Sequence, residues 1–176
     1  MKKIIILSVC LVLLLGLIVY AKFFIFNSPK LGMEIKSVFE NKAEIPSKYT
    51  CDGENISMPL EIQNISENAK TIVLIIDDPD APAKIWVHWI LFNIPVSGKE
   101  VEIKEGEKLG VSGINDFEKL EYKGPCPPSG THRYFIKAYA LDSELNLDEG
   151  VTKAQVEKEM KNHVIDSAEL IGLYSK

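Results

Sequence analysis

The chain has 176 residues, of which 46% are hydrophobic, and a formal net charge of −5 at pH 7. Residues 31–176 contain 16 basic and 25 acidic residues, a net charge of −9, because four lysines lie before this stretch and every acidic residue lies within it. Such an acidic surface repels phosphate backbones, which excludes nucleic acid as an expected partner, and the stretch has the size of one domain with a substantial core.

An apolar segment opens the chain. Two lysines precede an uncharged apolar run over residues 4–21, and the apolar character resumes after Lys22. A run of this length lies at the short end of what spans a bilayer, and basic residues before it favour an N-terminus inside the cell. We therefore expect residues 1–30 to be a single-pass membrane anchor or signal segment with a short linker, and residues 31–176 to be one domain outside the cytoplasm. A small-residue cleavage site at residues 19–21 keeps a removed signal peptide and a secreted domain as the alternative.

Strands are expected to dominate the domain. Alternating or β-branched apolar patterns predict five of them, over residues 33–39, 60–65, 69–76, 87–94 and 133–141. Residues 97–123 are charged and contain glycine, so we expect short edge strands and a long loop there, with a turn at residues 110–113. All five predicted strands come before the one segment of the domain that has a helical pattern.

One helix is expected near the C-terminus. Thr152 begins a capping box, Thr-x-x-Gln, and apolar residues then recur at four-residue spacing on one helix face. These residues are Val156, Met160 and Val164. The pattern predicts a helix over residues 153–166, followed by a closing strand over residues 168–174. Strands followed by a single late helix indicate a mostly antiparallel β domain with the helix packed on a sheet.

Two cysteines, Cys51 and Cys126, lie in the domain. Outside the cytoplasm such a pair can form a disulfide. Closing this loop would contribute about 4 kcal/mol of stability in the chain-entropy model. Two separately buried thiols are the alternative, and the sequence leaves both open.

Two proline-rich stretches carry the candidate site. The first is the acidic run over residues 77–80, which leads through a stiff turn to His88 at the start of a strand. The second, residues 124–134, reads Gly-Pro-Cys-Pro-Pro-Ser-Gly-Thr-His-Arg-Tyr and includes His132 and the only arginine of the chain. Proline and glycine make both turns poor helices or central strands. Rigid loops that deliver histidines to the ends of strands are typical of binding sites.

The residues of these stretches suit an anion. A carboxylate beside a histidine holds one ring nitrogen protonated and favours the charged ring. Two such histidines, the Tyr134 hydroxyl and loop N–H groups at Gly124 could bind a small phosphate or carboxylate. The alternative is structural, with Asp78 and Asp80 capping turns and both histidines hydrogen-bonded in the core.

Metal and nucleophile chemistry find less support. Neither His-x-x-x-His nor Cys-x-x-Cys spacing is present, so we expect no metal site. Ser129 and Cys126 share a loop with His132, but neither lies in the sequence context of an activated nucleophile. We therefore expect no catalytic residue.

The two stretches together resemble the phosphatidylethanolamine-binding protein (PEBP) family, most closely its bacterial and archaeal Raf-kinase-inhibitor-like branch. The resemblance rests on Asp-Pro-Asp-Ala-Pro at residues 78–82 with Trp86 and His88, and on residues 124–134. It covers nearly all of residues 31–176.

The resemblance implies a large antiparallel sheet packed with a smaller sheet, one or two peripheral helices, and a small anion pocket at one end of the large sheet. The ligand-binding positions it implies are Asp78, Trp86, His88, Gly124, His132 and Tyr134. Asp80 and Arg133 are expected to be structural, with Arg133 bracing the turn, and the bond before Pro82 matches one that the family holds cis. The loop before His132 is shorter than in animal members. The chain also ends soon after Tyr174, without their C-terminal helix.

We expect a non-catalytic binding protein that holds a phosphate or a phospholipid head group without a cofactor and contacts the membrane through its N-terminal segment. A second hypothesis is an inhibitor or regulator of a protein partner, such as a kinase or protease, acting through the rim at residues 124–130. A third is a hydrolase that uses the Asp/His cluster. Fold and pocket alone do not choose among them.

Overall fold

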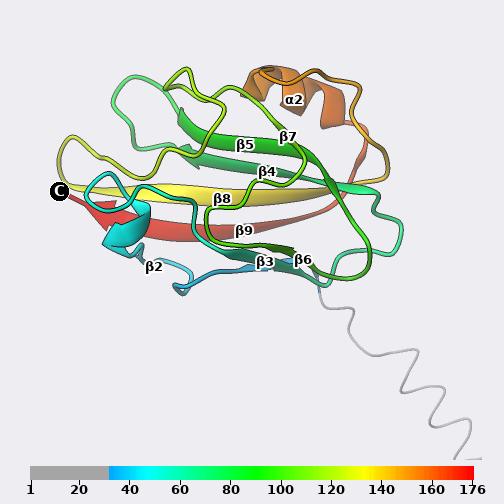
Figure 1. The fold of residues 1–176 in the computed structure, drawn as a ribbon, viewed down its shortest axis with the longest axis horizontal. Helices are drawn as coiled ribbons and strands as arrows, with labels where there is room; N and C mark the ends of the chain where they lie inside the picture. The colour runs from blue at the N-terminus through cyan, green and yellow to red at the C-terminus, as the bar shows by residue number, and fades with distance from the viewer. Residues whose placement is uncertain (1–31) are drawn as a thin grey trace, which may run out of the picture. The chain divides into compact units, whose positions relative to one another are not determined.

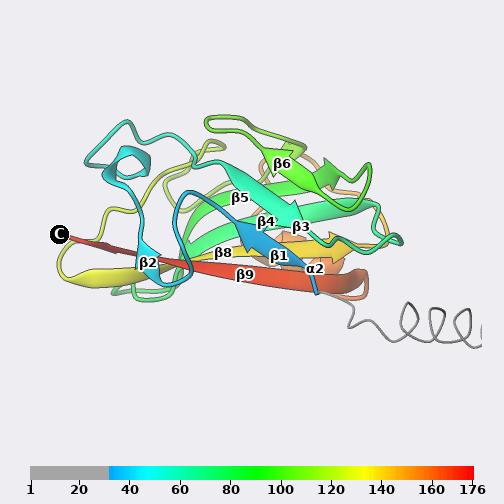
Figure 2. The ribbon, with the colours of Figure 1, turned by 90° about the horizontal axis from the view of Figure 1, so that it is seen from below.

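In the computed structural model, which describes residues 32–176, two β-sheets of unequal size stack on each other (Figure 1, Figure 2). The larger sheet has six strands and the smaller has three. This arrangement confirms the predicted mainly β fold with a large and a small sheet. The expected N-terminal anchor or signal helix lies outside the described residues, and no helix within them is long and apolar enough to cross a membrane.

The large sheet is antiparallel except at one edge, where β2 runs parallel to β9. Its strands in spatial order are β2 (Ala43–Glu44), β9 (Val164–Ser175), β8 (Thr131–Leu141), β4 (Thr71–Asp78), β5 (Trp86–Pro95) and β7 (Val111–Ser112). The antiparallel small sheet has the order β1 (Glu34–Lys36), β3 (Leu60–Gln63) and β6 (Val101–Ile103). The helices of residues 32–176 are the 3-10 turn η1 (Ser47–Tyr49) and α2 (Lys153–Met160).

The strand β4 is buried along its whole length in the middle of the large sheet. Its side chains alternate between two cores. Leu74 and Ile76 face the core between the two sheets. Val73 and Ile75 face a second core beneath α2, on the opposite side of the sheet. A strand buried on both faces requires the continuous apolar run that the sequence has there.

The helix α2 starts where the sequence predicts and ends earlier. The capping box at Thr152 is present, and Val156 and Met160 are buried against the large sheet. The predicted continuation to Asp166 is wrong, because α2 ends at Met160 and Val164 is already the first residue of β9. β9 pairs with β8 along its length, and these inter-strand hydrogen bonds outweigh the four-residue apolar spacing.

Two further details differ from the sequence predictions. Residues 110–113 contain the edge strand β7, paired with β5, instead of a turn; Gly110, with a φ of 74°, supplies the bend before it. The bond before Pro82 is trans, as is every peptide bond between residues 32 and 176. The connection between β4 and β5, residues 79–85, is long enough to reverse the chain without a cis bond.

Candidate functional site

One end of the large sheet brings the two proline-rich corners together. The strand β4 ends there at Asp78, opposite Trp86 at the start of β5, and β8 begins beside them. A cavity of about 250 Å³ lies at this end. The residues that line it are Asp78, Ala81, Pro82, Trp86, His88, Phe117, Cys126, Pro128, His132 and Tyr134. His88 and His132 therefore share one cavity, as predicted from the sequence.

Asp78 and His132 form a buried pair in this cavity. The Asp78 carboxylate accepts a hydrogen bond from His132 Nδ1 at 2.7 Å, and the two residues are 3% and 7% exposed. The other carboxylate oxygen accepts the backbone N–H of Asp80 at 2.8 Å. Because the carboxylate fixes a proton on Nδ1, the ring is left with Nε2, which has no hydrogen-bond partner within residues 32–176.

His88 is held differently. Its Nδ1 lies 2.6 Å from the carbonyl oxygen of Lys123, and a carbonyl only accepts, so Nδ1 carries the proton. Burial lowers the pKa of His88, while the carbonyls of Lys123 and Gly124 and the carboxylate of Asp78 oppose this shift. The neutral ring then presents an unprotonated Nε2, a hydrogen-bond acceptor.

The Tyr134 hydroxyl is buried without a hydrogen-bond partner in the part of the chain that the structure describes. Burial raises the pKa of this hydroxyl and the Asp78 carboxylate adds to the shift, so the group stays protonated as a donor. The backbone amide of Cys126 faces the hydroxyl, outside the geometry of a hydrogen bond. The Tyr134 ring packs edge-on against His88, with centroids 5.3 Å apart. A buried, unpartnered hydroxyl is destabilising on its own and requires an explanation.

Phe117 completes the apolar wall and was not among the predicted site residues. Its ring meets Trp86 and His88 edge-on, at centroid distances of 5.5 and 5.4 Å. The side-chain oxygen of Asn115 accepts a hydrogen bond from the backbone N–H of Phe117 at 3.0 Å. The Asp116 carboxylate accepts one from the backbone N–H of Val87 in β5 at 2.7 Å. The Asn-Asp-Phe sequence at residues 115–117 was the signal that could have identified Phe117 as a site residue. The side chains of Asn115 and Asp116 fix this turn, which holds the Phe117 ring against the cavity.

Gly124 does not line the cavity, contrary to prediction. Its backbone N–H donates to the Asn55 side chain at 2.8 Å, and a β-carbon at Gly124 would collide with the carbonyl of Tyr49. The glycine is therefore needed for close packing of two loops. The backbone amide that faces the cavity belongs to Cys126, two residues later. The predicted loop donor is present, but at a different residue.

Asp80 and Arg133 brace the two corners outside the cavity. The guanidinium donates to both carboxylate oxygens of Asp80, at 2.8 and 2.6 Å, and the Arg133 backbone N–H adds a third bond at 2.9 Å. These bonds hold the pKa of Asp80 at about 2. The bracing role predicted for Arg133 is present in the geometry.

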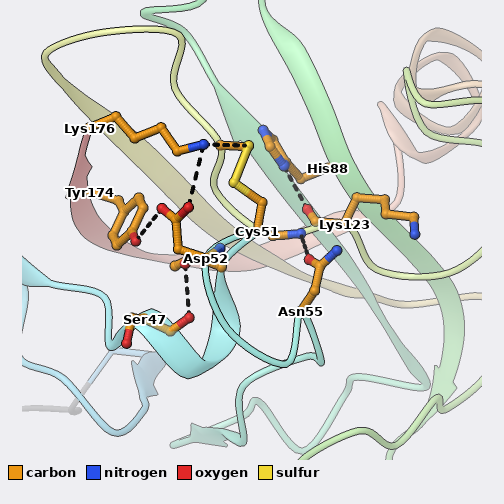
Figure 3. Close-up of a disulfide and its surroundings, with 11 residues drawn as sticks. Ser47, Cys51, Asp52, Asn55, His88, Lys123, Tyr174 and Lys176 are labelled. Carbon is orange, nitrogen blue, oxygen red and sulfur yellow. Dashed lines mark hydrogen bonds and ion pairs between the residues drawn. A yellow bond between two sulfur atoms is a disulfide. The ribbon is translucent and has the colours of Figure 1, made fainter.

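Cys51 and Cys126 form a disulfide with their Cα atoms 5.4 Å apart (Figure 3). This resolves the alternative that the sequence left open. Because Cys126 lines the cavity, the bridge ties the cavity wall to the loop that follows η1.

The polar groups of the cavity are suited to hydrogen bonding. Within residues 32–176 no cluster of three or more histidine, cysteine or acidic side chains is placed to hold a metal ion. Of the two nucleophile candidates, Cys126 is in the disulfide and Ser129 does not line the cavity. What the cavity offers is a tyrosine donor, a backbone amide and two imidazoles.

Comparison with known proteins places the chain among a group of relatives. A family model described as phosphatidylethanolamine-binding protein matches residues 35–175. A UPF0098 protein of Methanothermobacter thermautotrophicus is 49% identical over 150 residues, which are 82% of this chain and 99% of the relative. A UPF0098 protein of Pyrococcus horikoshii is 46% identical over 158 residues, 84% of this chain and 78% of the relative.

Two solved structures are similar to the domain. The crystal structure of a putative PEBP homolog from Chlamydia trachomatis superposes with a TM-score of 0.77 at 40% identity, over 82% of this chain and 98% of that one. Escherichia coli YbcL, described as a new member of the mammalian PEBP family, superposes with a TM-score of 0.75 at 27% identity, over 83% of this chain and 99% of that one. The sequence comparisons and the structure comparisons therefore indicate the same family.

Proposed function

The chain belongs to the phosphatidylethanolamine-binding protein family, and on that premise we propose that it is a binding protein whose cavity holds a small anion, a phosphate or the phosphate of a lipid head group. One observation carries the proposal. The Tyr134 hydroxyl is buried in the cavity with no hydrogen-bond partner within residues 32–176, beside the rings of His88 and His132, each of which is held through its Nδ1. Groups that folding leaves unsatisfied are suited to a ligand.

The balance of donors and acceptors favours an anion that also carries a hydrogen it can donate. The Tyr134 hydroxyl and the Cys126 amide are donors to the anion. Asp78 holds the His132 ring in place through Nδ1. Neutral His88 accepts, and the hydrogen that it needs comes from a P–OH group of free phosphate or a monoester, or from an N–H or O–H group elsewhere in a lipid head group.

The walls of the cavity strengthen these bonds. Trp86, Phe117, Pro82 and Pro128 are apolar, and a low local dielectric increases the strength of each hydrogen bond to a charge. The volume of about 250 Å³ suits a phosphate-sized group. Because residues 31–176 carry a net charge of −9, the local donors have to overcome an unfavourable long-range field.

The test is titration calorimetry of the protein with inorganic phosphate and with a soluble phosphate monoester. We expect saturable binding that His132→Ala and Asp78→Ala each abolish, with the fold checked by circular dichroism. His163→Ala is the matched control, because His163 is also paired with an aspartate, Asp142 at 2.8 Å, but lies on the surface. Unchanged binding in both cavity variants would reject the proposal. Comparison of the two ligands distinguishes recognition of phosphate itself from recognition of an ester.

We also propose that the domain lies outside the cytoplasm. The disulfide between Cys51 and Cys126 supports this, since such bonds persist in oxidising compartments. The basic and apolar start of the chain supports it as well. Digestion of intact cells with an external protease should remove the domain, and full protection until the cells are lysed would contradict this location.

A further inference from the structure

The disulfide connects the cavity to a loop that otherwise lies apart from it in sequence. Cys51 follows η1, and its backbone N–H donates to the carbonyl of Pro125 at 3.1 Å. Its sulfur is bonded to Cys126, whose amide faces the Tyr134 hydroxyl in the cavity. Figure 3 shows the bridge beside Asp52, which follows Cys51, and beside Tyr174 and Lys176, which lie at and just after the end of β9. The bridge is therefore part of the cavity wall.

The bridge is also the main anchor of the wall it belongs to. The loop over residues 124–130 is fixed at its start by the bond from Gly124 to Asn55 and by the bond from Cys51 to the Pro125 carbonyl. At its end it is fixed by two backbone bonds between Gly130 and Lys176, of 3.2 and 3.3 Å. Between these points, residues 126–129 form no backbone hydrogen bond within the described part of the chain. Two of the four are prolines, which have no N–H to donate.

We infer that the Cys51–Cys126 disulfide is a redox control of the cavity, so that the oxidised protein binds its anion and reduction weakens binding. With the bridge closed, the Cys126 amide and the Pro128 ring are held at the cavity. With the bridge open, residues 126–129 are free to move away, and the cavity loses its backbone donor. This inference rests on the proposed function and adds its regulation.

The bridge is placed so that a dithiol reductant can open it. Cys126 is exposed and Cys51 is partly exposed. Lys176 Nζ lies 3.6 Å from Cys126 Sγ and 3.4 Å from the Asp52 carboxylate. An ammonium group beside a sulfur stabilises its thiolate, and a stabilised thiolate leaves faster in exchange reactions. The geometry therefore assigns Cys126 as the leaving sulfur.

The exchange proceeds in two balanced steps. A thiolate of the reductant forms a bond to Cys51 Sγ, the bond between Cys51 and Cys126 breaks, and its electron pair leaves on Cys126 beside the Lys176 ammonium. The second thiol of the reductant loses its proton to water, and the resulting thiolate attacks the reductant's other sulfur, the one bonded to Cys51, which releases the Cys51 thiolate. The reductant ends as a cyclic disulfide, and the two electrons it loses reduce the bridge.

The experiment compares phosphate binding by the oxidised and the dithiothreitol-reduced full chain. We expect reduction to weaken the affinity for inorganic phosphate about ten-fold, the effect of losing one hydrogen bond to a charged group. Peptide mass spectrometry establishes the state of Cys51 and Cys126 separately from Cys10, the third cysteine of the chain. Equal affinity with the bridge open would overturn the inference. Absence of binding in both states would instead count against the proposed function.

Two further measurements keep the inference testable if variants of the bridge fold poorly. Hydrogen exchange should show faster exchange at Cys51 and Gly124, whose N–H groups bond to Pro125 and Asn55 between the two joined loops, in the reduced wild type, with β4 unchanged. Unaltered protection of these two N–H groups would contradict a released wall.

Lys176→Gln should slow reduction several-fold by removing the ammonium from the leaving sulfur. Lys108→Gln is the matched control, because Lys108 is also an exposed lysine paired with an acid, Glu149 at 3.0 Å, and it belongs to neither of the loops that the bridge joins. An unchanged rate in Lys176→Gln would overturn the assignment of Cys126 as the leaving group.

Discussion

Asp77 and Asp78 are consecutive residues of β4 that face opposite sides of the large sheet, and their surroundings differ in one respect. Asp77 has no exposed surface, and its two oxygens are occupied by Lys137 at 2.8 and 3.0 Å and by Lys153 at 2.6 Å. Asp78 is equally enclosed and bonded to His132, but its neighbourhood retains unpartnered groups. We call the first the closed cluster (Asp77, Lys137, Lys153) and the second the open cluster (Asp78, His88, His132, Tyr134).

The difference separates a structural role from a binding role. Every charged group of the closed cluster has an ionic partner, because Asp77 pairs with both lysines and Lys153 also lies 3.5 Å from Glu157. Lys153 lies in the first turn of α2, so the cluster fastens the helix to the sheet. The open cluster contains a buried hydroxyl, that of Tyr134, which the fold leaves without a partner within residues 32–176. Burial alone would not have distinguished the two aspartates. The count of satisfied and unsatisfied atoms does.

The largest expected effect comes from breaking the closed cluster. Asp77→Ala leaves two partly buried lysines without their shared partner, and we expect the free energy of unfolding to fall by about 3 kcal/mol. Phosphate affinity should stay within about two-fold of the wild type, a difference well under 1 kcal/mol. Urea unfolding and calorimetry measure the two quantities. A large loss of affinity in a variant that is still folded would show that the clusters are not separate in function.

The open cluster should respond in the opposite way. Tyr134→Phe removes a hydroxyl that has no partner in the fold, so we expect the stability to change by less than about 1 kcal/mol or to rise. Phosphate affinity should fall about ten-fold, because a donor to the anion is lost. Loss of stability without loss of affinity would identify the hydroxyl as a structural group and place Tyr134 with the closed cluster.

A smaller effect tests the state of His88. Its folded pKa lies below the ordinary value of 6.5 because of burial, so its contribution to stability is complete above about pH 6.5 and is lost as the pH falls through the folded value. The wild type should lose up to about 1.4 kcal/mol per pH unit from this group as the pH falls below about 6.5. His88→Gln should remove that part of the slope in urea unfolding, whereas His163→Gln, at an exposed residue, should keep it. An unchanged slope in His88→Gln would mean that the ring is charged in the folded protein.

Much of this arrangement could be predicted from local sequence. The β-branched run that became β4, the capping box at Thr152 and the two proline corners each depend on neighbouring residues, and they brought Asp78, His88 and His132 to one cavity. Prediction from local sequence failed where a contact with a distant segment determines the secondary structure. The helix lost residues 164–166 to β9, because β8 offers them a strand partner.

The choice of amide at the cavity shows the same limit. Gly124 looked like the loop donor, but Asn55 takes its N–H from another part of the chain and leaves Cys126 to face the cavity. Strand alternation places Asp77 and Asp78 on opposite faces of the sheet, but only the positions of Lys137 and Lys153 in the structure show which aspartate is closed. Such pairings depend on tertiary contacts that no local pattern contains.

The central claim is that the open cluster binds a small anion, and the most direct measurement is nitrogen-15 NMR of the histidine side chains during titration of the oxidised protein with inorganic phosphate. We expect the Nε2 resonances of His88 and His132 to shift saturably with a common dissociation constant, while exposed His163 stays unchanged. If His132 shows no saturable shift while the protein remains folded and oxidised, the account of this cavity is contradicted.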